Sequence, residues 1–297
     1  MSAFHGDPGT KALALAALEA SPPSPLVDPA GASVVELIAW ADRVGLPPAL
    51  ALLGAHLCAT RSFAADPASI GDAHAFLAAI EPGATTGRVP NAWVVWASEA
   101  SPTPLRALLS SPDCIEAAGT AMALHRRAAA GGEVARDAWR DARLGLGRLA
   151  EGEDDQARAM ATIAAGAWDF ELAPGAVSDL LQAWEGLSRT GIRRAAGWSE
   201  GDDVRLATML AEVKPRLEQG IGQRPDRSDA AAFALYVDHL QTGLDRLMSA
   251  LGDATWDRHK ALQAQFAGAA ATRRRQGLQA MIALLRPTSR PPIPAQP

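Results

Sequence analysis

Apolar residues recur every three or four positions along most of this chain. The pattern is clearest between residues 233 and 251, where apolar side chains are spaced four and three residues apart in alternation. This spacing is typical of the seam of a coiled coil. The residues of this heptad are Phe233, Val237, Leu240, Leu244, Leu247 and Leu251. The pattern therefore predicts a long amphipathic helix in this part of the chain.

An alanine-rich stretch from about Asp113 to Leu172 predicts the helical scaffold around which the fold is organised. Alanine has the highest helix propensity, and its small side chain lets helix backbones approach closely. Gly131-Gly132 should end the first helix of this stretch, and Pro174 should break the third. We expect most of the tryptophans, including Trp139 and Trp168, to fill gaps in the core.

The remaining helices are predicted from their capping residues and apolar stripes. Asp7 and Pro8 suit the start of a helix that runs to about Ala20. Further helices are expected at 33–44, 49–63, 72–80, around Trp93 and Trp96, at 177–187, after Ser199 and at 255–285. Residues 49–63 are apolar on almost every face and should lie centrally. Ser199 and Asp202 resemble a capping box, and Pro215 should kink or shorten the helix that follows.

These elements predict an all-α fold, a multi-helix bundle of packed antiparallel helices in one domain or two helical subdomains. Residues 101–104 read S-P-T-P and suggest a boundary between an N-terminal helical region, 1–104, and an alanine-rich bundle, 105–286. Residues 287–297 are rich in proline and should form a disordered tail. The single tyrosine and the few β-branched residues argue against a sheet.

The composition narrows the functional classes. A formal net charge of −5 gives no global attraction to nucleic acid or to anionic lipid. No apolar run reaches the roughly 18 residues of a membrane span, and no segment has the pattern of a signal peptide, so a cytoplasmic protein is expected. Cys58 and Cys114 cannot form a disulfide framework and are interpreted as small buried side chains.

Several segments together resemble a bacterial and phage-associated family of uncharacterised proteins rich in alanine and tryptophan. The matching segments are Phe4 to Pro8 (F-H-G-D-P), Gly45 to Pro47 (G-L-P), Phe76 to Ala84 (F-L-A-A-I-E-P-G-A), His125 to Glu133 (H-R-R-A-A-A-G-G-E) and Trp139-Arg140, with an echo at Leu278 to Leu285. Members usually carry a G-K-G-C-A-V-G-C segment after the first helix, whereas Leu26 to Val35 contains no cysteine here. The resemblance implies a helical fold but brings no known activity.

The sequence does not nominate a catalytic, cofactor or metal site. No histidine has a carboxylate three residues before it, as the ligand pairs of a di-iron bundle require. The chain has no phosphate-binding Gly-Lys-Ser/Thr loop and no Ser-x-x-Lys nucleophile segment. We therefore assign no cofactor, no metal site and no catalytic residue, although a triad assembled from distant positions stays open.

Three groups of residues are candidates for binding. His5, beside Asp7 at a helix N-terminus, could contact an anion, although Asp7 is interpreted mainly as the helix cap. Trp93 and Trp96, three residues apart on a short helix, could anchor a partner or close the core. Clustered arginines would contact nucleic acid if they converge on one face, or else favour helix C-termini; they are Arg126, Arg127, Arg193, Arg194, Arg273, Arg274 and Arg275.

The leading hypothesis is a non-catalytic helical protein-interaction module that acts as an adaptor, a regulator or an assembly component. A protein partner or self-association is expected, without membrane binding. One alternative is a small-molecule-binding protein or enzyme with a pocket between the two helical halves. The second alternative is nucleic-acid binding through convergent arginine pairs, which the negative net charge disfavours.

Overall fold

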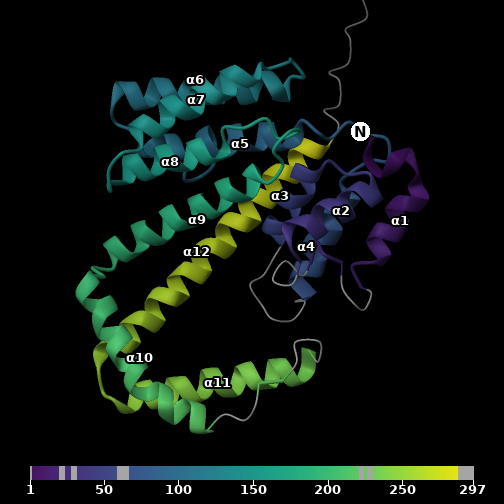
Figure 1. The fold of residues 1–297 in the computed structure, drawn as a ribbon. Helices are drawn as coiled ribbons and strands as arrows, with labels where there is room; N and C mark the ends of the chain where they lie inside the picture. Colours follow the sequence, from purple (N-terminus) through teal and green to yellow (C-terminus); the bar gives the residue numbers. More distant parts are fainter. Residues whose placement is uncertain are drawn as a thin grey trace, which may run out of the picture. The chain divides into compact units, whose positions relative to one another are not determined.

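The structure is a computed structural model that describes residues 2–19, 24–27, 32–58, 67–220, 224–225 and 230–286. These residues form helices connected by turns, and no strand occurs among them (Figure 1). The predicted all-α multi-helix fold is therefore confirmed. The elements are η1 (Ala3–Gly6), α1 (Pro8–Ala16), α2 (Val34–Val44), α3 (Pro48–Cys58), α4 (Pro67–Ala78), α5 (Val89–Glu99), η2 (Leu105–Leu108), α6 (Pro112–Ala129), α7 (Arg136–Leu149), α8 (Asp155–Gly166), α9 (Ala176–Ala195), α10 (Glu200–Gly220), α11 (Ala230–Ala250) and α12 (Ala254–Leu285).

The chain divides into two compact units. Unit 1 contains the described residues up to Trp184 together with 273–286, and unit 2 contains 185–272. Each of α9 and α12 therefore contributes residues to both units. The boundary suggested after residue 104 lies inside unit 1, where α5 packs on α6. The proline-rich tail, 287–297, lies outside the described residues.

Unit 1 is built around α3, as its apolar sequence predicts. Every residue of this helix except Pro48 and His56 is buried. Gly54 permits a close approach here, because a Cβ at this position would come within 2.5 Å of the Phe76 ring on α4. The helices α2, α4 and α5 surround α3, and α6, α7 and α8 pack on one another beyond α5. This largely apolar helix is thus covered along most of its surface.

Local capping signals fix several helix ends in unit 1. The carboxylate of Asp7 accepts hydrogen bonds from the backbone N–H groups of Gly9 and Thr10, both at 2.9 Å. Ser33 and Glu36 form a capping box at the start of α2, which ends at Gly45 with φ of 70°. The first helix stops at Ala16, earlier than the expected Ala20.

The end of α8 differs from the prediction. The helix stops at Gly166, well before Pro174, because the chain turns through Ala167 and Trp168. Trp168 is 38% exposed, so its prediction as a core residue is wrong. The guanidinium of Arg143 lies 3.4 Å from the centre of its indole ring and donates a hydrogen bond to the Ala167 carbonyl at 3.1 Å. A cation–π contact therefore takes the place of burial at this turn.

Unit 2 centres on the hairpin formed by α10 and α11, with the end of α9 and the first part of α12. Its apolar cluster consists of Met209, Val213, Met248 and Trp256, with four leucines packed against it. Pro215 lies inside α10, which continues to Gly220, so of the expected kink or shortening the helix is not shortened. The capping box of Ser199 and Asp202 is confirmed at the start of α10.

Candidate functional site

The short helix α5 places its two tryptophans differently. Trp93 has no exposed surface, and its Nε1 donates a hydrogen bond to the Gly277 carbonyl of α12 at 2.9 Å. Its ring centre lies 5.7 Å from that of Trp96 and 5.9 Å from that of Trp184. Burial contradicts a role for Trp93 as a surface anchor, and its position agrees with the alternative of a core element. Trp96 is half-buried.

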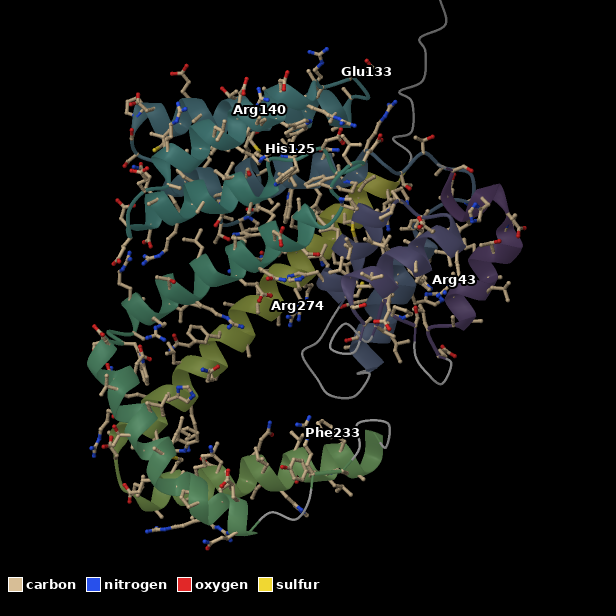
Figure 2. All side chains as sticks on the ribbon, in the orientation of Figure 1. Arg43, His125, Glu133, Arg140, Phe233 and Arg274 are labelled. Carbon is tan, nitrogen blue, oxygen red and sulfur yellow. The ribbon has the colours of Figure 1, made fainter. Side chains whose placement is uncertain are left out.

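His125 was not singled out for function by the sequence, and the structure buries it completely within unit 1 (Figure 2). Its Nδ1 lies 2.9 Å from Oδ1 of Asn91, and its ring centre lies 4.7 Å from that of Trp139 and 5.4 Å from that of Phe170. Burial lowers the pKa of His125 to about 3, although the backbone of Gly166 acts in the opposite direction. Its Nε2 has no hydrogen-bond partner among the described residues. The histidine is therefore neutral at physiological pH.

His5 belongs to a strained turn before α1. Phe4 and His5 both have φ near 50°, and the His5 backbone approaches Gly45 so closely that a Cβ there would lie 2.6 Å from its nitrogen. The Nε2 atom of His5 lies 3.2 Å from the Arg43 carbonyl at the end of α2. The ring thus contacts α2, while Asp7 caps α1 and its pKa is lowered, first by the hydrogen bond from the Gly9 backbone.

The clustered arginines in unit 1 have different surroundings. Arg126, in the last turn of α6, forms an ion pair with Glu99 of α5. Arg127 and Arg275 are exposed. The guanidinium of Arg273 lies 5.3 Å from the Trp184 ring centre, and both Arg273 and Arg274 are half-buried. Ion pairing and stacking leave fewer cationic groups available than the sequence alone suggested.

In unit 2, charged side chains join the end of α9 to the starts of α10 and α12. Arg193 forms an ion pair with Asp203, whose other oxygen accepts a hydrogen bond from Trp198 Nε1 at 2.9 Å. The hydrogen bond from Trp198 is the main cause that lowers the pKa of Asp203. Arg258 reaches Asp202 at 2.7 Å and the Gly197 carbonyl at 3.1 Å. We refer to these five side chains, Arg193, Trp198, Asp202, Asp203 and Arg258, as the helix junction.

The helix junction is extended along α12. His259 lies beside Trp198 and stacks on Trp256, with ring centres 5.9 Å and 5.4 Å apart, and burial lowers its pKa. Asp253 caps α12 and pairs with Arg205 of α10 at 2.6 Å. Hydrogen bonds, first from Thr255 and then from Arg205, lower the pKa of Asp253 to about 2. These contacts satisfy most charges of the network and indicate a structural role.

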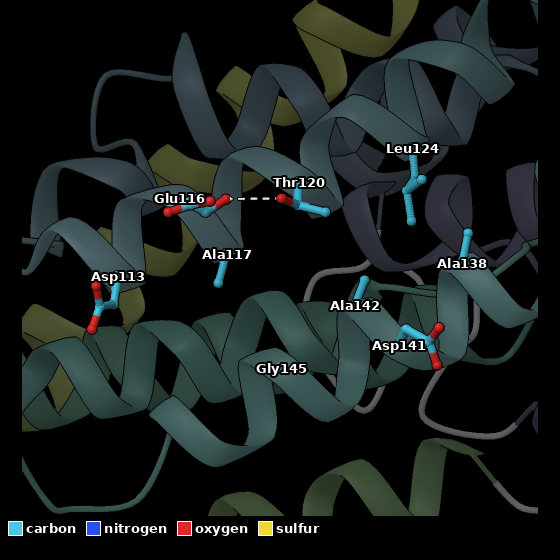
Figure 3. A pocket seen from close by; sticks show the side chains of 9 residues that line it. All are labelled: Asp113, Glu116, Ala117, Thr120, Leu124, Ala138, Asp141, Ala142 and Gly145. Carbon is cyan, nitrogen blue, oxygen red and sulfur yellow. Dashed lines mark hydrogen bonds between the residues drawn. The ribbon is translucent and has the colours of Figure 1, made fainter.

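A groove of about 490 Å³ runs between α6 and α7 (Figure 3). Its lining combines the carboxylates of Asp113, Glu116 and Asp141 with small side chains such as Ala117 and Ala142. The hydroxyl of Thr120 is engaged by its own helix, because it donates to the Glu116 carbonyl at 3.1 Å. In the part of the chain that the structure describes, no group of three or more His, Cys, Asp or Glu side chains could hold a metal ion.

All six heptad side chains of α11 are half-buried, but only those of its C-terminal half pack against the apolar cluster of unit 2, which the sequence pattern alone could not show. Leu244, Leu247 and Leu251 pack against the cluster of Met209, Val213, Met248 and Trp256. Val237 and Leu240, nearer the start of the helix, lie outside this cluster and are half-buried, and Leu235 is 62% exposed. Phe233, which also belongs to the heptad, lies on the same half of α11 (Figure 2). The N-terminal half of the helix is therefore an incompletely covered apolar surface.

Neither cysteine forms a disulfide, since both are free and buried. Burial, together with the charge of Asp72, raises the pKa of the Cys58 thiol. No single helix within the described ranges is long and apolar enough to cross a membrane, and only α2 and α3, bent by 117°, pass that test as a pair.

Comparison with protein-family models, with curated proteins and with solved structures gave no match to this chain.

Proposed function

We propose that this protein is a non-catalytic helical interaction module that uses the N-terminal half of α11 as its contact surface. The observation that supports this is that only the C-terminal half of the α11 heptad packs against the apolar cluster of unit 2. Val237 and Leu240 continue the apolar spacing of Leu244 and Leu247, but they lie outside the apolar cluster of unit 2 and are half-buried. A second helix packed on this face would complete the seam.

One further apolar side chain on this half of α11 is solvent-exposed, because Leu235 is 62% exposed. Burying apolar area stabilises a complex by roughly 25 cal/mol per Å², so a few such side chains can anchor one helix. Spacings of four and three residues suit pairing with a helix better than binding of an extended peptide.

The first partner to test is a second copy of this chain, in keeping with a role as an assembly component. Two α11 helices packed against each other would form a symmetric interface in which each seam covers the other. The partner could instead be a helix of another protein, as an adaptor or regulator would require. A cytoplasmic location, and kinship with the alanine- and tryptophan-rich family, form part of the same proposal.

Sedimentation velocity over a concentration series tests self-association. Wild-type protein should form a dimer, and Leu240→Glu should weaken it by at least about tenfold, since a buried unpaired charge costs more than 1.4 kcal/mol. Gln241→Glu adds the same charge at the next, exposed position of α11 and should leave the dimer intact. Circular dichroism of both variants would confirm that the helices remain folded.

A photo-crosslinker at position 240, with position 241 as the matched control, extends the test to other proteins. Selective cross-linking from position 240 to a second copy or to one recurring host protein supports the proposal. A wild-type chain that stays monomeric and cross-links equally from both positions would contradict it.

A further inference from the structure

A pocket of about 340 Å³ lies between α10 and α11 in unit 2. The helix α10 contributes Arg216 and its last turn, and α11 contributes Tyr236, His239, Thr242 and Arg246. Gly243 lets the helices approach at one end, because a Cβ there would lie 3.1 Å from Leu217. The two helices thus bring five polar side chains from distant parts of the sequence to one opening.

The formally charged side chains that line this pocket are both positive. Two guanidinium groups line it, and no carboxylate is among the lining residues. Neither Arg216 nor Arg246 forms an ion pair or hydrogen bond with any residue that the structure describes. Other arginines of unit 2 are neutralised, as Arg205 is by Asp253 and Arg258 by Asp202. Two unneutralised arginines facing one pocket are therefore unusual within this unit.

We propose that this pocket binds a phosphate group. A guanidinium donates two parallel hydrogen bonds to a phosphate, and two guanidiniums match the nearly double negative charge that a phosphomonoester carries near neutral pH. The hydroxyls of Tyr236 and Thr242 supply further donors. The volume is that of a small-molecule site, so the phosphate is free or carried on a small organic body.

The arginines of the phosphate site and the apolar side chains of the proposed contact surface are different residues, although Tyr236 and His239 of the pocket lie on the same half of α11. Val237 and Leu240 belong to the seam, whereas Arg216, Thr242 and Arg246 belong to the pocket. Phosphate binding can therefore fail while self-association holds, and the reverse is equally possible.

Isothermal titration calorimetry at constant ionic strength tests the site. Wild-type protein should bind inorganic phosphate at one saturable site, and the double variant Arg216→Gln/Arg246→Gln should weaken binding by at least about tenfold, because both charge-assisted contacts are lost. Arg275→Gln removes the same kind of charge from an exposed position on α12 and should bind as the wild type does. Tighter binding of glycerol phosphate would identify a phosphomonoester, and equal or weaker binding would identify free phosphate.

Three results would each overturn the proposal. Absence of saturable heat with both probes, binding that persists in the double variant, or an equal loss in Arg275→Gln would show that the pocket is not a phosphate site. Folding of the double variant is checked by circular dichroism, and it should be preserved because neither arginine contacts another described side chain through a polar bond.

Discussion

The two units of this protein hold their tryptophans in different ways. In unit 1, Trp93 is fully enclosed and donates its indole hydrogen bond to a backbone carbonyl of α12. In unit 2, Trp198 and Trp256, of which Trp256 belongs to the small apolar cluster, donate to the carboxylates of Asp203 and Asp245, both at 2.9 Å. The indole N–H of each ring has a hydrogen-bond acceptor, but only that of Trp93 donates to an uncharged group.

This difference follows from how many helices surround each ring. Unit 1 has enough helices to enclose α3 and α5, so an indole there can be covered entirely by apolar side chains and backbone. Unit 2 has a hairpin and parts of two further helices, and Trp198 and Trp256 there each keep 8% of their surface exposed. Charged groups can remain solvated there while they hold the indole in place. The stability of unit 1 should therefore depend on the buried volume of its side chains, and the stability of unit 2 on polar contacts.

The largest expected effect of a single substitution is that of Trp93→Ala. Removing a fully buried indole should lower the free energy of unfolding by about 3–5 kcal/mol, since the cavity that remains cannot collapse completely. Denaturant unfolding measures the loss, and hydrogen exchange with mass spectrometry should show faster exchange in α3, α5 and the last part of α12.

Trp96→Ala is the matched control, because Trp96 lies on the same helix and is half-buried. It should cost clearly less than Trp93→Ala. Equal losses for the two variants would contradict the view that enclosure by packed helices gives unit 1 its stability.

Much of the fold could be predicted from the sequence because its signals are local. The caps formed by Asp7 and Ser199 depend on neighbouring backbone groups, and α3 was placed centrally because its apolar residues lie on every face. The end of α8 could not be predicted in this way. It depends on a contact between Trp168 and Arg143 of another helix, which no local pattern reveals.

The candidate sites were less predictable for the same reason. Trp93 and Trp96 have equivalent positions in the sequence pattern, and only the packing of α12 shows that one of them is enclosed. The pocket of Arg216 and Arg246 joins residues about thirty positions apart on two helices, and no short motif marks it. His125 stands in an alanine-rich helix, and its partner Asn91 comes from α5.

The pH dependence of stability gives a second test of unit 1, because His125 is a fully buried titratable side chain. Its pKa is lowered to about 3 in the folded protein, against about 6.5 in an unfolded chain, so the unfolded state binds more protons between these values. The free energy of unfolding should therefore fall as the pH drops below about 6.5, with a slope of up to about 1.4 kcal/mol per pH unit. Urea unfolding at several pH values measures this slope.

His125→Leu should remove that part of the slope between about pH 6.5 and pH 5, where few carboxylates yet titrate. At neutral pH it should still destabilise the protein by about 1–3 kcal/mol, because the buried Asn91 side chain loses its partner. His74→Leu, at an exposed position of α4, is the control and should leave the slope unchanged. A wild-type slope identical to that of His125→Leu would show that the buried ring accepts a proton without unfolding.

The smallest effect should come from Trp198→Phe, which tests whether polar contacts hold unit 2. Phenylalanine keeps an aromatic ring beside Arg258 and His259 but cannot donate the hydrogen bond to Asp203. The expected loss is about 1 kcal/mol, as for a single hydrogen bond, and the pKa of Asp203 should rise towards its ordinary value because its main lowering contact is gone. Denaturant unfolding and NMR titration of the Asp203 carboxylate measure the two changes. If the stability falls by as much as in Trp93→Ala, unit 2 depends on the volume of its rings as unit 1 does, and the contrast between the units fails.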